Sequence, residues 1–177
     1  DIDRIVHLAA QAGVRHSMVD PYAYVQSNVM GHLTMLELAR GIKGLRHFVY
    51  ASTSSVYGGN TDMPFRETDR VDTPLSLYAA SKRADELISH AYAHLFGFPQ
   101  TGLRFFTVYG PWGRPDMAYY SFAKAIAAGE PIVLYDDGRL KRDFTYIDDI
   151  VAGVVGALDR PPTDEPRILN IGNHRAE

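Results

Sequence analysis

Short apolar runs alternate with longer stretches of helical periodicity along this chain, and that alternation constrains its fold more than any other feature. The apolar runs at residues 5–10, 48–51, 101–106 and 168–171 have the length of buried strands. Residues 20–41, 76–96 and 147–158 between them carry apolar side chains at helical spacing. Strand–helix–strand alternation is typical of a parallel sheet with right-handed crossovers. The sequence therefore predicts an α/β fold of the Rossmann type, with a doubly wound parallel sheet.

Capping residues mark the ends of the predicted helices. Asp20 and Pro21 suit the N-cap and the first helical position. Gly97 and Gly129 suit the ends of helices over residues 76–96 and 116–128. The apolar positions at helical spacing in the first helix are Val25, Val29, Leu33, Leu36 and Ala39. The residues predicted on the buried side of the second helix are Leu87, Ala91, His94 and Leu95. Further predictions are a surface excursion over residues 58–76, a short strand at 132–135, a turn at 136–138 and an extended segment at 140–146.

Composition excludes several classes of protein. The 177 residues suffice for one domain with a core, and a net charge of −3 without a basic block gives no reason to expect a nucleic-acid partner. No apolar run reaches the roughly 18 residues of a membrane span, and we expect no signal peptide. The lack of cysteine excludes disulfides and thiolate metal sites and fits a cytoplasmic protein. The chain does not start with Met, and we interpret it as the middle of a longer polypeptide.

Tyr78 and Lys82 stand four residues apart in the predicted helix 76–96. Side chains at this spacing share one helix face, so the phenol and the ammonium would point into the same space. A phenol has a pKa of about 10, and a nearby cation lowers that pKa by favouring the phenolate. The pair therefore predicts a general base that works near neutral pH. The spacing by itself also fits a half-buried Tyr beside a solvated Lys.

Polar or small residues follow three of the predicted strands, at Ala9–Gln11, Ser52–Ser55 and Thr107. Ligands of parallel sheets bind beyond the carboxyl ends of the strands. We therefore expect these three strand ends and the Tyr78–Lys82 face to converge on one cleft.

These residues resemble the extended short-chain dehydrogenase/reductases of the NAD-dependent epimerase/dehydratase family. The matching segments are residues 7–10, Asn28, residues 52–58, Tyr78 with Lys82, residues 103–106 and residues 142–144. Within that family, residues 9–15, 109–117 and 141–149 are most similar to UDP-glucuronate 4-epimerases. The resemblance implies NAD-dependent 4-epimerisation of a UDP-sugar, UDP-glucuronate to UDP-galacturonate, through a 4-keto intermediate. It also implies a homodimer for the full-length protein.

The resemblance assigns roles to individual residues, with Tyr78 as the acid and base at the sugar 4-hydroxyl. The implied catalytic residues are Tyr78, Lys82 and Thr53; the implied NAD contacts are Ala9, Ala10, Gln11, Asn28, Ser52, Tyr78 and Lys82; the implied substrate contacts are Arg15, Thr53, Ser54, Ser55, Thr107, Arg114 and Arg142. Arg114 would bind a carboxylate with its planar fork, and Arg142 would bind the diphosphate. No metal is expected, because Asp148 and Asp149 suit a helix start better than a metal site.

The chain departs from the family pattern at one point, because it contains no glycine-rich turn for the cofactor pyrophosphate. The family places that turn before the position where this chain starts. We therefore interpret residues 1–108 as the C-terminal part of an NAD-binding domain, and residues 109–177 as mixed substrate-binding segments with a returning helix and strand. Three alternatives stay open: another nucleotide-sugar epimerase, a 4,6-dehydratase, and an inactive fragment or nucleotide-sugar binder. Ser54 and Ser55 stand where a dehydratase of the family has an Asp-Glu pair, which argues against the second.

Overall fold

A four-stranded parallel sheet forms the centre of the computed structural model, which describes residues 2–134, 138 and 141–173. Its strands lie in the order β1, β2, β3 and β6, formed by Arg4–His7, His47–Thr53, Gln100–Phe105 and Arg167–Ile171. All three strand pairs are parallel, from Arg4 opposite His47 to Phe105 opposite Ile171. The predicted α/β fold is confirmed.

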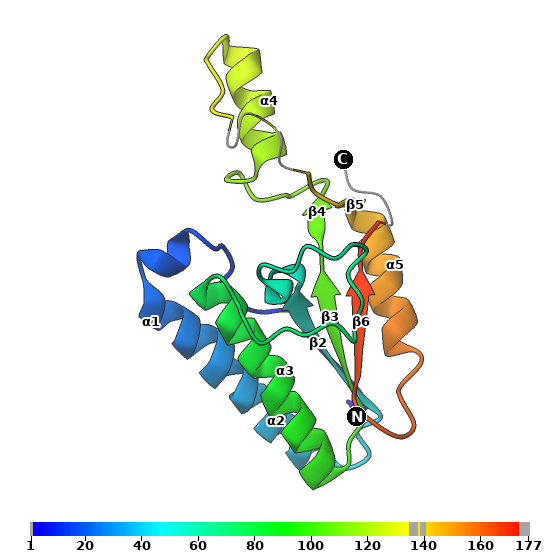
Figure 1. The fold of residues 1–177 in the computed structure, drawn as a ribbon. Coiled ribbons are helices and arrows are strands. Elements are labelled where there is room, and N and C mark those ends of the chain that lie inside the picture. Colours follow the sequence, from blue (N-terminus) through cyan, green and yellow to red (C-terminus); the bar gives the residue numbers. More distant parts are fainter. Residues whose placement is uncertain (1, 135–137, 139–140, 174–177) are drawn as a thin grey trace.

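Helices cover both faces of this sheet (Figure 1). On one face, α1 (Pro21–Tyr24), the π-helical η2 (Val25–Met30) and α2 (Gly31–Gly41) follow one another and lie beside α3 (Leu77–Phe96). On the other face lies α5 (Ile147–Leu158). Successive side chains of a strand point to opposite faces. Accordingly, Phe48 and Tyr50 of β2 pack with α2, whereas Val49 between them packs with Ala157 of α5.

The predicted helix ends are confirmed. Asp20 caps the first helix by accepting a hydrogen bond from the backbone N–H of Ala23 at 3.2 Å. Ser76 caps α3 in the same way, with its hydroxyl 3.1 Å from the backbone nitrogen of Ala79. Gly97 and Gly129 end α3 and α4 in the left-handed conformation, at φ values of 70° and 71°. Residues 58–76 form neither helix nor strand, as predicted.

The first strand is shorter and more exposed than predicted. It ends at His7, and Leu8 beyond it is 52% exposed. β1 borders the sheet, with β2 as its one partner in the described part of the chain. The expectation of a strand over residues 5–10 that is buried on both faces is therefore wrong, because the strand ends at His7 and Val6 within it is 37% exposed.

The buried side of α3 is polar, contrary to expectation. The predicted positions Leu87, Ala91, His94 and Leu95 are all exposed. The buried positions of the same helix include Lys82, Asp85, Glu86 and Ser89. Val25 of the first helix is likewise exposed, whereas Tyr24, Asn28 and His32 are buried. Each of these inward polar side chains has a hydrogen-bond partner, which offsets the cost of its burial.

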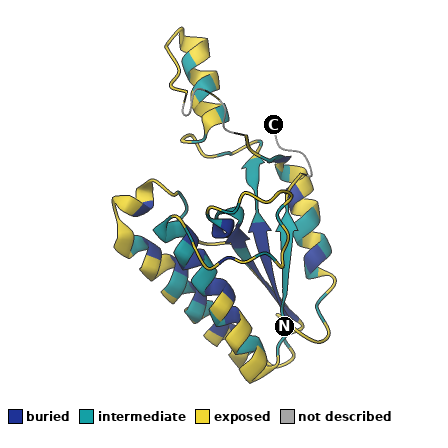
Figure 2. Cartoon of the chain, in the orientation of Figure 1, coloured by how far each residue is buried: buried dark blue, intermediate teal, exposed yellow. Residues whose placement is uncertain are grey.

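A smaller unit lies beyond the carboxyl end of the sheet (Figure 1). β4 (Thr107–Tyr109) and β5 (Phe144–Tyr146) form a two-stranded parallel sheet there. α4 (Ala118–Ala128) projects away from the rest of the chain and has no buried residue (Figure 2). The strand predicted at 132–135 is not formed by residues 132–134, so that prediction is wrong for them. Residues 135–137, which include most of the predicted turn, and Leu140 lie outside the described residues.

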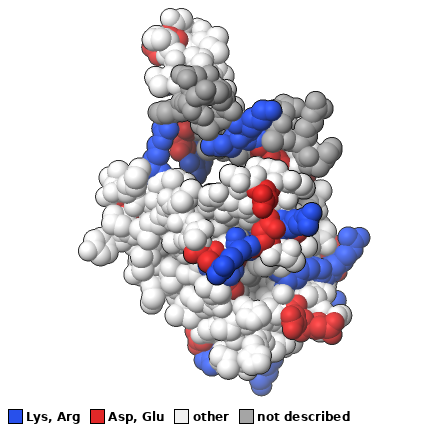
Figure 3. All heavy atoms as spheres, in the orientation of Figure 1, with Lys and Arg blue, Asp and Glu red and all other residues white. Residues whose placement is uncertain are grey.

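Two short 3₁₀ helices complete the described elements, η1 (His16–Met18) and η3 (Ser54–Tyr57). Within the residues that the structure describes, no helix has the length and apolar character needed to cross a membrane. On the face drawn in Figure 3, Lys and Arg side chains are interspersed with Asp and Glu.

Candidate active site

A cavity of about 580 Å³ lies beyond the carboxyl ends of β2 and β3. Its volume falls in the range of small-molecule sites. The structure brings seven of the sequence-predicted site residues to its wall: Thr53, Ser54, Ser55, Tyr78, Thr107, Arg114 and Arg142. Sequence reasoning missed Trp112 and Tyr119, which also line it. Both lie within five residues of Arg114, so the aromatic side chains near Arg114 were the sequence signal that could have identified them.

Tyr78 lies in the first turn of α3, directly after the Ser76 cap. Its ring meets the ring of Tyr24 edge to face, with centroids 6.1 Å apart. Burial raises the pKa of Tyr78 above its ordinary value, while a hydrogen bond with Thr53 and the charge of Arg114 act in the opposite direction. Thr53 is held in turn by Ser55, whose backbone N–H donates to the Thr53 hydroxyl at 3.2 Å. A hydroxyl and a phenol are thus placed side by side at the cavity wall.

Lys82 is buried, and its ammonium donates to Oδ2 of Asp85 at 2.6 Å. Burial raises the pKa of Asp85 to about 6, although the charge of Lys82 opposes that change. Burial outweighs the nearby groups and raises the pKa of Tyr78, so a lowering of that pKa by Lys82 stays a prediction.

Arg114 already holds a carboxylate in a bidentate contact. Its Nε and Nη2 donate to the two carboxylate oxygens of Asp116 at 2.9 and 2.6 Å. The loop around it is irregular, as predicted, and Trp112 adopts a φ of 63° there. Arg142 is exposed at the cavity and donates to the backbone carbonyl of Lys141 at 2.8 Å. The fork of Arg114 is thus shown in the geometry that suits a ligand carboxylate.

Of the residues assigned to the cofactor, Tyr78 lines this cavity, whereas residues 9–11 and Asn28 do not line it and lie near the carboxyl end of β1. Asn28 joins that end to α3: it accepts from the backbone N–H of Gln11 at 2.7 Å and donates to the hydroxyl of Ser81 at 2.9 Å. Ala9 and Ala10 are exposed there, and their small side chains leave the backbone accessible to a flat ligand. The residues present therefore fit part of a dinucleotide site at the ligand-binding edge of the sheet. Gly13 and Val14 line the cavity, but the next residue, Arg15, does not.

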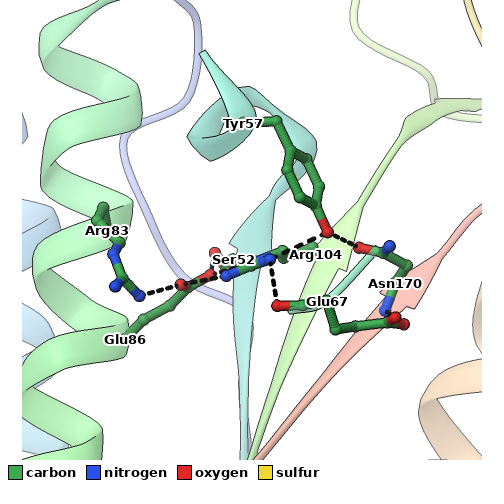
Figure 4. A network of polar contacts seen from close by, with 7 residues as sticks. All are labelled: Ser52, Tyr57, Glu67, Arg83, Glu86, Arg104 and Asn170. Carbon is green, nitrogen blue, oxygen red and sulfur yellow. Dashed lines mark hydrogen bonds and ion pairs between the residues drawn. The ribbon is translucent and has the colours of Figure 1, made fainter. Parts of the chain in front are cut away.

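A buried polar network fixes α3 against the sheet (Figure 4). Arg104 of β3 binds Glu86 of α3 with two hydrogen bonds of 2.9 Å, and the hydroxyl of Ser52 donates to the same carboxylate at 2.6 Å. Arg104 also donates to the hydroxyl of Tyr57 at 3.0 Å, and that hydroxyl donates to Asn170 of β6 at 2.7 Å. Sequence reasoning did not predict this network. The one sequence feature that could have indicated it is Arg104, a single charged residue within an apolar strand.

Taken together, these features define a Rossmann-type α/β protein with a Tyr-Lys pair at the carboxyl edge of its sheet. Residues 1–172 match the model of the NAD dependent epimerase/dehydratase family, and the chain belongs to that family. Among the described residues, no group of three His, Cys, Asp or Glu side chains is arranged to hold a metal ion.

Three similar proteins illustrate the relationship. A probable UDP-glucuronate 4-epimerase of Rhizobium meliloti is 56% identical over 164 residues, which cover 93% of this chain and 48% of the relative. The structure of the UDP-glucuronic acid 4-epimerase from Bacillus cereus, in complex with UDP-glucuronic acid and NAD, matches with a TM-score of 0.93 and 40% identity over 99% of this chain and 55% of that one. A UDP-N-acetylglucosamine 4-epimerase from Methanobrevibacter ruminantium matches with a TM-score of 0.89 and 30% identity over 99% of this chain and 56% of that one. The chain thus spans about half the length of these relatives.

Proposed function

We propose that the full-length protein is an NAD-dependent 4-epimerase that converts UDP-glucuronate to UDP-galacturonate. One observation carries the proposal: the carboxylate-binding fork of Arg114 and the hydroxyls of Thr53 and Tyr78 line the same cavity. The similarity to UDP-glucuronate 4-epimerases, at 56% and 40% identity in the two cases above, supports it. The division of the chain at residue 108 into cofactor and substrate segments also stays a proposal.

In this mechanism Tyr78 handles the proton of the sugar 4-hydroxyl. NAD, when bound, supplies the hydride acceptor and donor for C4. Tyr78 accepts the hydroxyl proton in one direction and donates it in the other, with the sugar turned over between the two. The hydroxyl of Thr53 both donates and accepts, so it serves the alcohol and the ketone alike. The raised pKa of Tyr78 favours the protonated phenol and therefore its role as the acid.

The remaining assigned residues hold the two ligands. NAD would lie at the end of β1 and along α3. There it would contact residues 9–11, Asn28, Ser52 and Lys82. Arg114 would bind the C6 carboxylate, with Thr107, Ser54 and Ser55 beside it and Arg15 in support. Arg142, exposed at the cavity, would bind the diphosphate. Holding the carboxylate matters chemically, because a 4-keto uronate is a β-keto acid that loses CO₂ if its carboxylate rotates freely.

Incubation of the full-length protein with NAD and UDP-glucuronate, UDP-glucose or UDP-xylose tests this proposal, with products identified by NMR. We expect UDP-galacturonate from UDP-glucuronate and much slower turnover of the two neutral sugars. Preference for a neutral sugar would refute the uronate assignment. A 4-keto-6-deoxy product would instead identify a 4,6-dehydratase, and no turnover of any sugar would favour a nucleotide-sugar binder.

We also propose that the full-length protein forms a homodimer and is cytoplasmic. The outer sides of the adjacent helices α2 and α3 expose Leu38, Leu87 and Leu95 at 54%, 55% and 67%. Exposed apolar side chains on adjacent helices can contribute to an association surface. Sedimentation of the full-length protein and of its Leu87→Asp variant tests this: the variant should be monomeric, whereas a monomeric wild type would refute the proposal.

A further inference from the structure

One edge of the Arg114 guanidinium is held by a carboxylate that lies outside the cavity. Nε and Nη2 of Arg114 donate to the two carboxylate oxygens of Asp116 at 2.9 and 2.6 Å. Arg114 lines the cavity, whereas Asp116 does not. The side chains of Arg114 and Asp116 are 45% and 64% exposed. Because an exposed ion pair adds little to stability, the main effect of this contact is the orientation that it gives to Arg114.

The guanidinium also reaches the cavity wall near the acid–base residue. Nη2 of Arg114 lies beside Gly13, 3.6 Å from the position that a Cβ would take there, and Gly13 lines the cavity. The backbone carbonyl of Gly13 accepts a hydrogen bond from the hydroxyl of Tyr24 at 2.6 Å, and the ring of Tyr24 meets that of Tyr78 edge to face. Arg114 thus extends from Asp116 outside the cavity to the neighbourhood of Tyr78 within it.

Three N–H donors of Arg114 remain for a ligand. A guanidinium has five such donors in a planar fork, and the contact with Asp116 uses one on Nε and one on Nη2. The other three belong to Nη1 and Nη2. Two of these form a second edge of the fork, which matches a carboxylate in the same bidentate way.

The backbone of the Arg114 loop is already held by close packing. Gly110 has a φ of 139°, and a Cβ at this residue would lie 2.6 Å from Cγ2 of Ile147 in α5. A Cβ at Gly113 would overlap the hydroxyl of Tyr119 in α4. The freedom that remains in this loop is therefore largely that of the long Arg114 side chain, and the carboxylate contact restricts it.

We propose that Asp116 is a positioning residue, which holds the Nε–Nη2 edge of Arg114 so that the second edge meets the C6 carboxylate of the sugar. A side chain that is already ordered loses less freedom when the ligand binds, and this strengthens binding. The proposal rests on the proposed function, in which Arg114 binds that carboxylate.

Two other roles of Asp116 predict different results. If the sugar carboxylate took the place of Asp116 on the same edge, Asp116 would compete with the substrate, and its removal would strengthen binding. Asp116 also stands two residues before α4, and a negative charge is favourable at the start of a helix. In that role its effect would not depend on Arg114. The position of Asp116 outside the cavity favours the positioning role.

The first experiment measures kcat and KM for UDP-glucuronate in the full-length wild type, Asp116→Ala and Asp72→Ala. Asp72 is the matched control, because it pairs with Arg70 at the same sequence spacing and at 2.6 Å but does not line the cavity. Asp116→Ala should raise KM by about threefold to tenfold and leave kcat within about twofold. Asp72→Ala should change neither value, and both variants should bind plain UDP like the wild type. An unchanged or lower KM in Asp116→Ala would refute the proposal.

A double-mutant cycle separates positioning from an effect on α4. If Asp116 acts through Arg114, Asp116→Ala should not raise KM further in the Arg114→Ala background. A rise as large as in the wild-type background would assign Asp116 to the start of α4 and exclude the positioning role.

A third measurement does not depend on activity. The exchange of the Arg114 Nε–H with water is followed by ¹⁵N NMR in the full-length wild type and in Asp116→Ala, with the resonance assigned through Arg114→Ala. Asp116→Ala should accelerate the exchange by about threefold or more, because the Nε–H loses its charged acceptor. Equal exchange in both proteins would show that Asp116 does not hold Arg114. No preference of the wild type for UDP-glucuronate over UDP-glucose would refute the proposed function, and this measurement would still test Asp116.

Discussion

At the residue scale, Tyr78 occupies a point where a hydroxyl, a guanidinium and a second phenol meet. We expect Tyr78→Phe in the full-length protein to lower kcat by about 10²- to 10⁴-fold, because the acid–base group is lost. The circular dichroism spectrum should not change. Tyr22→Phe is the matched control, since Tyr22 is 84% exposed and lies outside the cavity. Activity of Tyr78→Phe within twofold of wild type would remove Tyr78 from the mechanism.

Arg114 offers the sharpest test of the substrate. In Arg114→Ala we expect epimerisation of UDP-glucuronate to slow by roughly 10- to 100-fold, as for the loss of a charge-assisted contact. A 4-keto-pentose with net NADH should also appear, because the free carboxylate can rotate and leave as CO₂. Product NMR and NADH absorbance measure both effects.

Arg70→Ala is the control for Arg114, because Arg70 also pairs with an Asp two residues later, at 2.6 Å on the surface. Binding of plain UDP should stay the same in both variants. An equal loss of affinity for UDP and UDP-glucuronate, without decarboxylation, would make Arg114 a phosphate ligand.

His32 predicts part of the pH dependence of stability. Burial lowers the pKa of His32 to about 3, so the folded state keeps it neutral while the unfolded state binds a proton below its ordinary value of 6.5. The stabilisation of the folded state by neutral His32 is therefore complete above pH 6.5. It is lost as the pH falls toward 3, by about 1.4 kcal/mol per pH unit. The contribution of Asp85 to stability changes with pH in the opposite direction. Burial raises its pKa from 3.8 to about 6, so its stabilisation is complete below pH 3.8 and is lost as the pH rises through 6.

Urea unfolding of the wild type and His32→Gln at pH 7, 6 and 5 measures this prediction. Gln retains a partner for Ser89, which is 2.7 Å from Nε2 of His32. The free energy of unfolding of the variant relative to wild type should rise by about 1.4 kcal/mol for each unit by which the pH falls below 6.5. A difference that does not depend on pH would show that His32 titrates normally in the folded protein.

At the element scale, the network around Arg104 joins α3 to β2, β3 and β6 (Figure 4). Arg104→Ala should lower the free energy of unfolding by about 3–5 kcal/mol, because it leaves the carboxylate of Glu86 buried without its main partner. Arg40→Ala breaks an exposed pair with Glu37 and should cost about 0–1 kcal/mol. Equilibrium urea unfolding compares the two variants. Equal and small effects would show that the network contributes little to the anchoring of α3.

At the scale of the whole molecule, the 177-residue chain holds the proposed acid–base residues but no glycine-rich turn. We expect the 177-residue chain by itself to bind NAD weakly or not at all, because the helix N-terminus that receives a pyrophosphate is missing from it. Titration calorimetry of this chain and of the full-length protein measures the difference. Tight, stoichiometric binding by the 177-residue chain would contradict the interpretation that its cofactor site is incomplete.

The sequence by itself determined the parallel sheet, the helix ends and the neighbourhood of the cavity. These depend on local signals: the cap Asp20, the terminal Gly97 and Gly129, and polar residues directly after strands. In a parallel sheet, residues that follow adjacent strands must lie at one edge. For that reason the pattern of strands and helices suffices to predict that Thr53, Tyr78 and Thr107 line one cavity.

Only the tertiary structure decided which side of α3 is buried and which partners its charges have. Helical periodicity predicted Leu87 and Leu95 inside, yet Lys82, Asp85 and Glu86 are inside. Glu86 is stabilised there by Arg104, a residue 18 positions away on another element, and such a partner is not visible in the pattern of α3. The pKa of Tyr78 follows the same rule, because the burial that raises it depends on how the helices pack on the sheet.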